Sequence, residues 1–305
     1  MLRTILLLII AVIIIPIASF YLSDPLTAEQ TQILWNSFYL MIGISLVCFV
    51  LSEITQNMSQ VDKLWSIKPV IYAWYITYAF HWDPRMILMS VLATLWGARL
   101  TYNFGRRGGY SIKFWEGMED YRWEVLRQEP ALKGRFRFMM FNLFFISLYQ
   151  NALVWLFTLP ILFTANGMGK GINIYDVICS VLIIGFIVTE TIADQQQYDY
   201  QTEKHRKIKA GEPLEGDFAK GFIDTGLWGK VRHPNYASEQ AIWIVFYFFS
   251  VAATGVWFNW SGAGAVLLVI LFHSSADFSE GISAKKYPLY KEYIKSIPRF
   301  IPKLW

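Results

Sequence analysis

The stretch GLWGKVRHPNYASEQ, residues 226–240, runs directly into the apolar stretch AIWIVFYFFSVAATGVWFNW, residues 241–260. About 20 mostly apolar residues are enough for a helix to cross the roughly 30 Å hydrocarbon core of a bilayer. We therefore expect a membrane helix that begins in a polar, basic segment. The polar side chains of that segment are Arg232, His233, Asn235, Tyr236 and Glu239.

The start of this helix is the first candidate site. Pro234 suits the first turn of a helix, where its missing N–H costs nothing. Tyr236 and Glu239 are three positions apart and would share one helix face. Basic side chains beside free backbone N–H groups favour an anion, so the segment predicts a site for a phosphate-bearing or carboxylate-bearing cofactor. The alternative is an interfacial loop whose basic residues only set the membrane topology.

The composition places the chain among membrane proteins. Of 305 residues, 55% are hydrophobic, 17% aromatic and only 16% charged, which is too apolar for a typical soluble protein. The net charge is +4, and most Lys and Arg lie in residues 105–137, 195–237 and 276–305. This clustering is typical of cytoplasmic loops and gives no support for nucleic-acid binding. Cys48 and Cys179 lie inside apolar runs and predict neither a disulfide framework nor a CxxC metal site.

The apolar runs predict an all-α fold, a multi-pass transmembrane bundle of seven or eight spans that forms one domain over residues 1–305. Eight spans put both termini on the side of the basic loops, which is the cytoplasmic side. Seven spans result if the first run is a removed signal peptide or lies in the interface. The fifth run is long enough for a tilted helix or for one broken near Pro160. The expected spans are residues 2–21, 33–54, 67–82, 86–104, 138–164, 174–193, 238–260 and 263–274.

Ionisable residues at the ends of membrane spans are costly and mark functional candidates. Asp62, in SQVDKLWSIKP, follows the second span. A raised pKa beside the apolar Leu64 and Trp65 would help Asp62 to donate a proton. Alternatively, Asp62 is a turn residue or pairs locally with Lys63, and Glu53 is a competing acid.

The block WGARLTYNFGRRGGY, residues 96–110, is a second basic candidate. Arg99 and Asn103 are four positions apart and share one helix face. Arg106 and Arg107 follow, and arginine suits bidentate contacts with phosphate. The alternative has Arg99 extending to the interface and the arginine pair acting as a topology signal.

Acidic candidates complete the set. Glu190 and Asp194, in TETIADQQQYDY, are four positions apart and suit ribose hydroxyls, or alternatively a structural ion pair with an arginine. Glu280, expected just past the last span, is a further ligand candidate. The four histidines are scattered without HExxH-type spacing, so no metal site is expected. The chain has no GxGxxG after a strand and no Walker loop.

Four blocks together resemble the steroid 5-alpha-reductase-like superfamily: GLWGKVRHPNY…E, WGARLTYNFGRRGGY, ETIADQQ and KKYPLYKEYIKSIPRFIP. The resemblance covers residues 62–305, which would form a reductase-like core, and the best match is an uncharacterised membrane branch of the superfamily. It implies an oxidoreductase that takes hydride from NADPH, in a pocket open to the cytoplasm, and reduces an activated C=C bond of a lipid-soluble substrate. Membrane lipids are the other expected partners. The membrane would be the endoplasmic reticulum in a eukaryote or the inner membrane in a bacterium.

The resemblance also implies site residues. In the steroid reductases a Glu and a Tyr polarise the enone carbonyl; Asp62 matches the Glu position, whereas Trp96 stands at the Tyr position and cannot donate a phenolic proton. Tyr102 is the candidate substitute, although on a different helix face. By position, the cofactor pocket would be lined by Arg99, Asn103, Arg107, Tyr110, Asp194, Arg232, Asn235 and Glu239. The chemistry of the blocks themselves adds Arg106, His233, Tyr236 and Glu280 as cofactor-binding candidates.

Two other function classes remain open. Isoprenylcysteine and phospholipid methyltransferases carry a similar RHP-x-Y…E run, in which Arg232 and Glu239 would hold the amino acid part of S-adenosylmethionine. NADPH needs more cations than S-adenosylmethionine does, so the arginines at positions 99, 106, 107 and 232 favour NADPH. A non-enzymatic membrane scaffold of the same fold is the third class.

Overall fold

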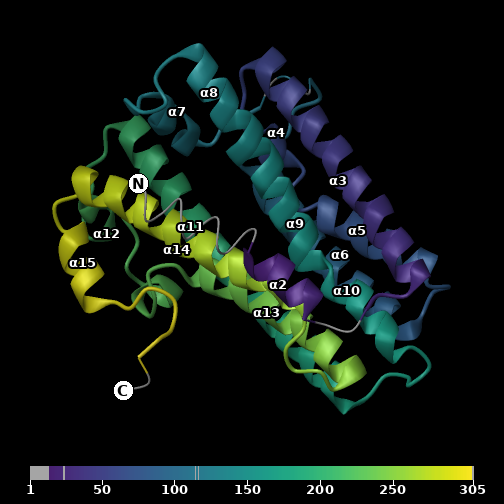
Figure 1. Ribbon diagram of the computed structural model, residues 1–305. Helices are drawn as coiled ribbons and strands as arrows, with labels where there is room; N and C mark the ends of the chain where they lie inside the picture. The colour runs from purple at the N-terminus through teal and green to yellow at the C-terminus, as the bar shows by residue number, and fades with distance from the viewer. Residues whose placement is uncertain (1–13, 23–24, 114, 116, 304–305) are drawn as a thin grey trace. The chain divides into compact units, whose positions relative to one another are not determined.

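The computed structural model of the protein describes residues 14–22, 25–113, 115 and 117–303. These residues fold into helices joined by turns, without a β-strand among them (Figure 1). The helices are α2 Ile15–Tyr21, α3 Ala28–Thr55, α4 Gln60–Lys63, α5 Lys68–Ala79, α6 Pro84–Arg106, α7 Tyr121–Arg127, α8 Arg135–Phe141, η2 Asn142–Tyr149, α9 Gln150–Thr158, α10 Pro160–Phe163, η3 Thr164–Gly167, α11 Ile174–Ala210, α12 Asp217–Lys220, η4 Gly226–Gly229, α13 Pro234–Thr254, η5 Trp260–Gly262, α14 Ala263–Lys286 and α15 Tyr290–Ser296.

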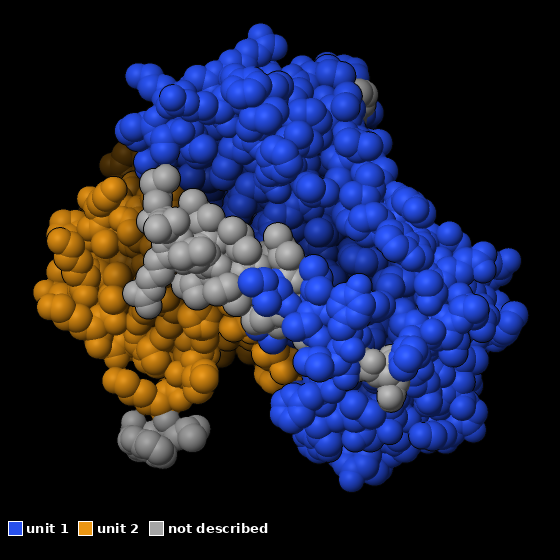
Figure 2. Space-filling view, viewed as in Figure 1, with its two compact units in different colours: residues 1–180, 246–267 blue, residues 181–245, 268–305 orange. Residues whose placement is uncertain are grey.

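The chain divides into two compact units, which Figure 2 shows in different colours. Unit 1 comprises residues 1–180 and 246–267, and unit 2 comprises residues 181–245 and 268–305. In unit 1, α5 packs against α6, and both α3 and α9 pack against α5. The organisation as one domain stays a prediction.

Four helical stretches are long and apolar enough to cross a membrane: Ala28–Thr55, Arg135–Gly167, Ile174–Ala210 and Trp260–Lys286. They lie at the second, fifth, sixth and eighth predicted spans, so the expectation of an all-helical protein with helices of the membrane-crossing type is confirmed. The first predicted span lies outside the described residues up to residue 13, and α2 is its described end.

The third predicted span, residues 67–82, is shorter than expected. The helix there, α5, has 12 residues. At 1.5 Å per residue this makes it about 18 Å long, so it does not cross the hydrocarbon core by itself. Lys68 and Pro69 open the helix, and α5 ends after Ala79 with Trp82 in the left-handed backbone region at φ 62°.

Two helices extend beyond the predicted spans. The helix α11 continues to Ala210 and α14 to Lys286, instead of ending at residues 193 and 274. Hydropathy falls where these helices become polar, but side-chain pairs continue to support the helix, as between Gln195 Nε2 and Asp199 Oδ1 at 2.7 Å. Glu280 therefore lies inside α14 and not beyond it.

The side chains of α3 are distributed in the opposite way from those of a soluble helix. Small and polar residues occupy its buried face, including Gln30, Ser37, Ser45, Cys48 and Ser52. Its exposed side chains include Trp35, Tyr39, Leu40, Leu46, Val47, Val50 and Ile54. An exposed apolar surface of this extent on a helix of membrane-crossing length is what contact with lipid requires.

The fifth predicted span is one continuous helical stretch with two irregular sites. The helix α9 ends at Thr158 and α10 begins at Pro160, so the helical pattern is interrupted at Leu159, one residue before this proline, while the stretch as a whole continues. The π-helix η2, Asn142–Tyr149, was not predicted from the sequence. Segments of π-helix are rare and frequently occur at functional sites.

A buried ion pair in unit 1 joins the first turns of α6 and α11. Arg85 Nε lies 2.8 Å from Asp176 Oδ1 and Arg85 Nη2 lies 3.0 Å from Asp176 Oδ2, with the side chains 2% and 0% exposed. Asp176 also accepts a hydrogen bond from the Asn173 N–H at 2.8 Å, and Arg85 donates to the carbonyl of Gly171. Because both charges are satisfied, the pair holds the two helix starts together. Neither residue was singled out from the sequence.

We predict that Asp176→Ala lowers the free energy of unfolding by about 3–5 kcal/mol, because Arg85 would remain buried without its anion. The measurement is the apparent melting temperature of the detergent-purified protein. Arg206→Ala is the control, since it breaks an exposed pair with Glu203 at 2.8 Å and should leave melting nearly unchanged. Equal melting of the two variants would contradict a structural role for the buried pair.

Candidate functional site

In unit 1, Asp62 lies in the single turn α4 and is held by a tryptophan from α7. The indole Nε1 of Trp123 donates a hydrogen bond to Asp62 Oδ2 at 3.1 Å. The Asp120 N–H donates to Ser59 Oγ at 3.0 Å, which fastens the start of α7 to the turn before α4. Burial raises the pKa of Asp62, while the nearby Arg122 opposes the rise. The pKa of Asp62 is thus shifted upwards, in the direction that the sequence analysis considered for a proton donor.

The block 96–110 reaches the same turn through Tyr110. Its hydroxyl donates a hydrogen bond to the carbonyl of Lys63 at 2.8 Å. A close backbone contact completes the arrangement: a Cβ at Gly117, where φ is +117°, would lie 2.9 Å from the carbonyl oxygen of Gly109. The structure therefore brings Asp62 and Tyr110 into one local cluster of unit 1.

The candidate residues of α6 differ in their exposure. Asn103 is buried, and its Oδ1 accepts hydrogen bonds from Arg106 Nε at 2.9 Å and Nη2 at 2.7 Å. Tyr102 is 70% exposed, with the Arg106 guanidinium 5.6 Å from its ring centroid. Trp96 is fully buried. A proton donor acts best in a dry site, so the exposure of Tyr102 does not favour it as the substitute phenol. Arg99 is partly buried and Arg107 is exposed.

In unit 2, one carboxylate is shared by two arginines and a histidine. Glu280 Oε1 lies 2.8 Å from Arg232 Nε and 2.9 Å from His233 Nε2, and Glu280 Oε2 lies 2.8 Å from Arg299 Nη2. The side chains of Arg232 and Glu280 are 8% and 5% exposed. We call these four residues the Glu280 hub.

The Glu280 hub fastens the C-terminal segment to the start of α13. The Arg232 guanidinium also donates to the carbonyls of Ile294, at 2.9 Å, and Ile297. The backbone N–H of Arg232 donates to the Pro298 carbonyl at 2.9 Å. Arg232 and Glu280 thus have structural partners that the sequence did not reveal, and their role in cofactor binding stays a prediction.

The start of α13 itself is as the sequence predicted, since the helix begins at Pro234. The ring of Tyr236 stacks on the ring of His233, with centroids 5.2 Å apart and an interplanar angle of 14°. Asn235 Nδ2 lies 3.4 Å from Asp194 Oδ1, which places the polar end of α11 against α13. Glu239 accepts a hydrogen bond from Trp243 Nε1 at 3.3 Å.

Three buried carboxylates gather on these two helices. Glu190, Asp194 and Glu239 are each 4% exposed. Glu190 and Asp194 are four positions apart on α11, as Asn235 and Glu239 are on α13, so each pair shares one helix face. Buried acceptors of this kind suit ligand hydroxyl groups, which are hydrogen-bond donors.

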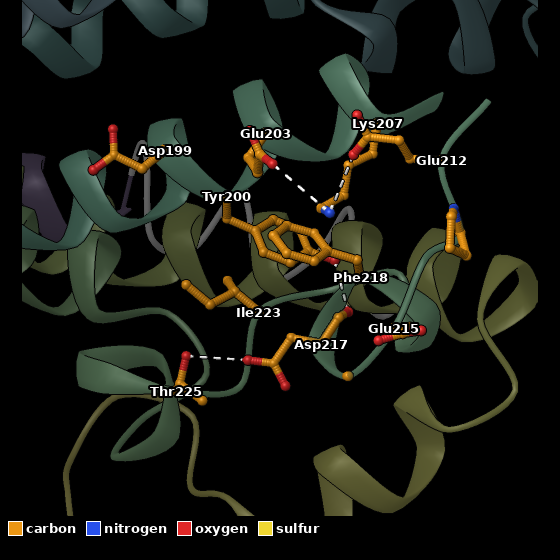
Figure 3. Close-up of a pocket in the computed structure, with 12 residues that line it drawn as sticks. Asp199, Tyr200, Glu203, Lys207, Glu212, Glu215, Asp217, Phe218, Ile223 and Thr225 are labelled. Atoms are coloured by element: carbon orange, nitrogen blue, oxygen red, sulfur yellow. Dashed lines mark hydrogen bonds and ion pairs between the residues drawn. The ribbon is translucent and has the colours of Figure 1, made fainter. Parts of the chain in front are cut away.

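A cleft of about 940 Å³ lies elsewhere in unit 2, and Figure 3 shows the residues that line it. Its wall includes Asp199, Glu203, Glu212, Glu215 and Asp217, with Lys207 as the one basic residue. The rings of Tyr200 and Phe218 stack there at 5.2 Å. None of the predicted site residues lines this cleft, and its carboxylates would repel a phosphate-bearing cofactor.

Metal ligation finds no support in the described part of the chain. No group of three His, Cys, Asp or Glu side chains there has the geometry to hold a metal ion. The main residue that sequence reasoning missed in unit 1 is Trp123, the partner of Asp62. Its only sequence signal is Asp120, which caps α7 by accepting a hydrogen bond from the Arg122 N–H at 2.9 Å.

The fold and the sites define an all-helical protein with helices of membrane-crossing length and buried polar clusters in each unit. The family model described as "Protein of unknown function (DUF1295)" matches residues 48–297, and the chain belongs to this family. The chain is 33% identical over 288 residues to the uncharacterized protein C594.04c of Schizosaccharomyces pombe, a match that covers 88% of this chain and 81% of that protein. No solved structure matches the chain.

We predict that Asp62→Asn raises the melting temperature near neutral pH. A carboxyl group whose folded pKa is raised supports the fold below its ordinary pKa of 3.8, and this support is lost as the pH rises through the folded pKa. The amide stays neutral and can still accept the hydrogen bond from Trp123. The gain over the wild type should shrink as the pH is lowered towards 4, and a lower melting temperature of the variant at pH 7 would contradict the buried-acid interpretation.

We predict that Glu280→Gln frees the C-terminal segment, because Arg232 and Arg299 would lose their shared anion. Tryptic cleavage after Arg299 should become at least about tenfold faster, which corresponds to only about 1.4 kcal/mol. Asp277→Asn is the matched control, since Asp277 is 69% exposed and lies 2.7 Å from the same Arg299. The Glu280 hub would lose its assigned role if both variants were cleaved at the wild-type rate.

Proposed function

We propose that this protein is a multi-pass integral membrane oxidoreductase that uses NADPH to reduce an activated C=C bond of a lipid-soluble substrate. The observation that carries the proposal is Asp62, a carboxyl group with a raised pKa that is held by Trp123. Membership of the steroid 5-alpha-reductase-like superfamily, suggested by the four sequence blocks, belongs to the same proposal. The proposal also includes cytoplasmic termini and an arrangement of seven or eight membrane spans. In this arrangement α5 and its flanking turns form the third span.

The proposed role of Asp62 is that of a general acid. Reduction of a C=C bond conjugated with a carbonyl places negative charge on the carbonyl oxygen, and a protonated carboxyl group beside that oxygen stabilises this charge. The Trp123 indole N–H orients the carboxyl group through a hydrogen bond, and the uncharged indole places no positive charge beside it. A methyl transfer has no such need for an acid at the acceptor, so this site favours the reductase over the methyltransferase.

The arginines at the end of α6 suit the phosphate groups of NADPH. The cofactor, when bound, supplies a hydride. Arg106 and Arg107 in unit 1 offer planar donor groups to phosphate oxygens. In the structure, the basic residues support NADPH binding less strongly than they do in the sequence pattern, because Arg232 already forms an ion pair with Glu280.

The test is ligand-dependent melting with NADPH, NADH and S-adenosylmethionine in parallel. A ligand that binds only the folded protein at 100 times its Kd stabilises it by about 2.7 kcal/mol. We expect NADPH to stabilise the protein and Asp62→Asn to keep that stabilisation, because Asp62 is assigned to the substrate. Stabilisation by S-adenosylmethionine alone would overturn the proposal.

The same variants separate binding from turnover. With a panel of long-chain enones, Asp62→Asn should reduce NADPH consumption by about 10²–10⁴-fold without lowering the melting temperature. Arg107→Ala should weaken the NADPH stabilisation, whereas Arg135→Ala, also exposed, should not. Undiminished turnover by Asp62→Asn would rule out the proposed acid.

A further inference from the structure

A second polar group, away from the carboxyl of Asp62, lies inside the helices of unit 1. It consists of Cys48 and Ser52 on α3, Lys68 and Tyr72 on α5, and Asn151 on α9, and we call it the Lys68 cluster. Lys68 and Tyr72 are one turn apart on α5, and α5 packs against both α3 and α9. All five residues are buried; Lys68 is 1% exposed, and Tyr72 and Asn151 are fully buried.

The ammonium group of Lys68 has neutral partners. Its Nζ donates to Asn151 Oδ1 and, at 3.5 Å, to the carbonyl of Val61. The ring of Trp65, with its centroid 5.9 Å from Nζ, is a further neutral neighbour, and no third hydrogen-bond acceptor is found within the described residues. Nor does any carboxylate of these residues form an ion pair with it: Asp62 acts on Lys68 only at longer range, and Glu53 accepts a hydrogen bond from Asn142 at 2.8 Å. A buried cation without an anion costs several kcal/mol.

Two hydroxyl groups of the cluster also lack partners. Among the described residues, Tyr72 Oη and Ser52 Oγ are buried and make no hydrogen bond. Cys48 lies close enough to Lys68 and Tyr72 to interact with them electrostatically. Folded proteins rarely leave buried hydroxyls unpaired. An unneutralised cation beside two unpaired hydroxyls is the donor set that a carboxylate would satisfy.

An apolar groove begins one helical turn from the cluster. It has a volume of about 220 Å³ and lies between α3 and η2, with Ile42, Leu46, Leu143 and Phe144 in its wall. Its two serines are turned to internal acceptors, Ser45 Oγ to the Met41 carbonyl at 2.8 Å and Ser147 Oγ to Asn142 Oδ1 at 3.1 Å. The groove therefore presents hydrocarbon to an occupant.

The groove and the cluster follow one another along the same two helical stretches. Ser45 precedes Cys48 by three positions on α3. Ser147 precedes Asn151 by four, and Asn151 Nδ2 donates to the Ser147 carbonyl at 2.6 Å. The groove thus ends about one helical turn from Cys48 and Asn151, and Asn151 accepts a hydrogen bond from Lys68. Both stretches are long and apolar enough to cross a membrane, so the occupant would enter from lipid.

We propose that unit 1 binds a single-chain amphiphile with a carboxylate head, that is, a fatty acid. Its chain lies in the groove between α3 and η2, and its carboxylate accepts hydrogen bonds from Lys68 Nζ and Tyr72 Oη. This site is additional to the proposed reductase function, since neither NADPH nor Asp62 takes part in it. Binding of the fatty acid is therefore tested without cofactor.

The experiment is saturation binding of radiolabelled dodecanoate to the full chain in phosphatidylcholine nanodiscs, with empty nanodiscs as background. We expect saturable binding that Tyr72→Phe weakens by about ten- to a hundredfold, the effect of one hydrogen bond to a charged group. Tyr78→Phe is the matched control, because Tyr78 lies on the same helix and is 66% exposed. This variant should bind dodecanoate as the wild type does. Lys68→Met should weaken binding by at least about tenfold, and the exposed Lys133→Met should not.

Three results would overturn the proposal. The first is binding no greater than that of empty nanodiscs. The second is equal affinity of the Tyr72→Phe and Tyr78→Phe variants. The third is equal affinity for dodecan-2-one, which has a similar chain and a neutral oxygen. If Lys68→Met failed to fold, the comparison of Tyr72→Phe with Tyr78→Phe would still test the proposal. Tyr72→Phe removes only a hydroxyl group that makes no hydrogen bond within the described residues.

Discussion

A charge buried among these apolar helices has to find its partner inside the protein, because an unpaired ion costs several kcal/mol away from water. Arg85 meets this condition with Asp176, and Arg232 meets it with Glu280. Each pair joins segments that are distant in the chain, the starts of α6 and α11 in one unit and α13 and α14 in the other. The positions of these helices within each unit thus depend on a few ion pairs as well as on packing.

The same condition gives the polar residues of the motif at the start of α13 two kinds of role. Arg232 and His233 face Glu280 and hold the segment after α15, while Asn235 and Glu239 lie on the face of α13 that meets Asp194. The residues of one polar motif therefore divide into those that contact Glu280 and those that contact Asp194 or Trp243. Only the three-dimensional partners separate them, since all are polar and all stand within eight positions of the sequence.

Sequence reasoning succeeded where the signal was local. Pro234 begins α13, and burial raises the pKa of Asp62, which lies in an apolar stretch of the sequence. It fell short where the signal was a contact between distant residues. Trp123 is 61 positions from Asp62, and Glu280 is 48 positions from Arg232. Hydropathy also misplaced the ends of α11 and α14, because a polar helix has no hydropathy signal even when its hydrogen bonds continue.

The π-helix η2 has a consequence for how the fifth helical stretch tolerates insertions and deletions. Loss of one residue from Asn142–Tyr149 would let this segment adopt the tighter α-helical pattern. A π-helix turns less per residue than an α-helix, so the loss of one residue and the tightening of the segment act in opposite directions on the helical phase of α9. A single-codon deletion within η2 would therefore disturb the contact of Asn151 with Lys68 less than a deletion within an α-helical part of the same stretch.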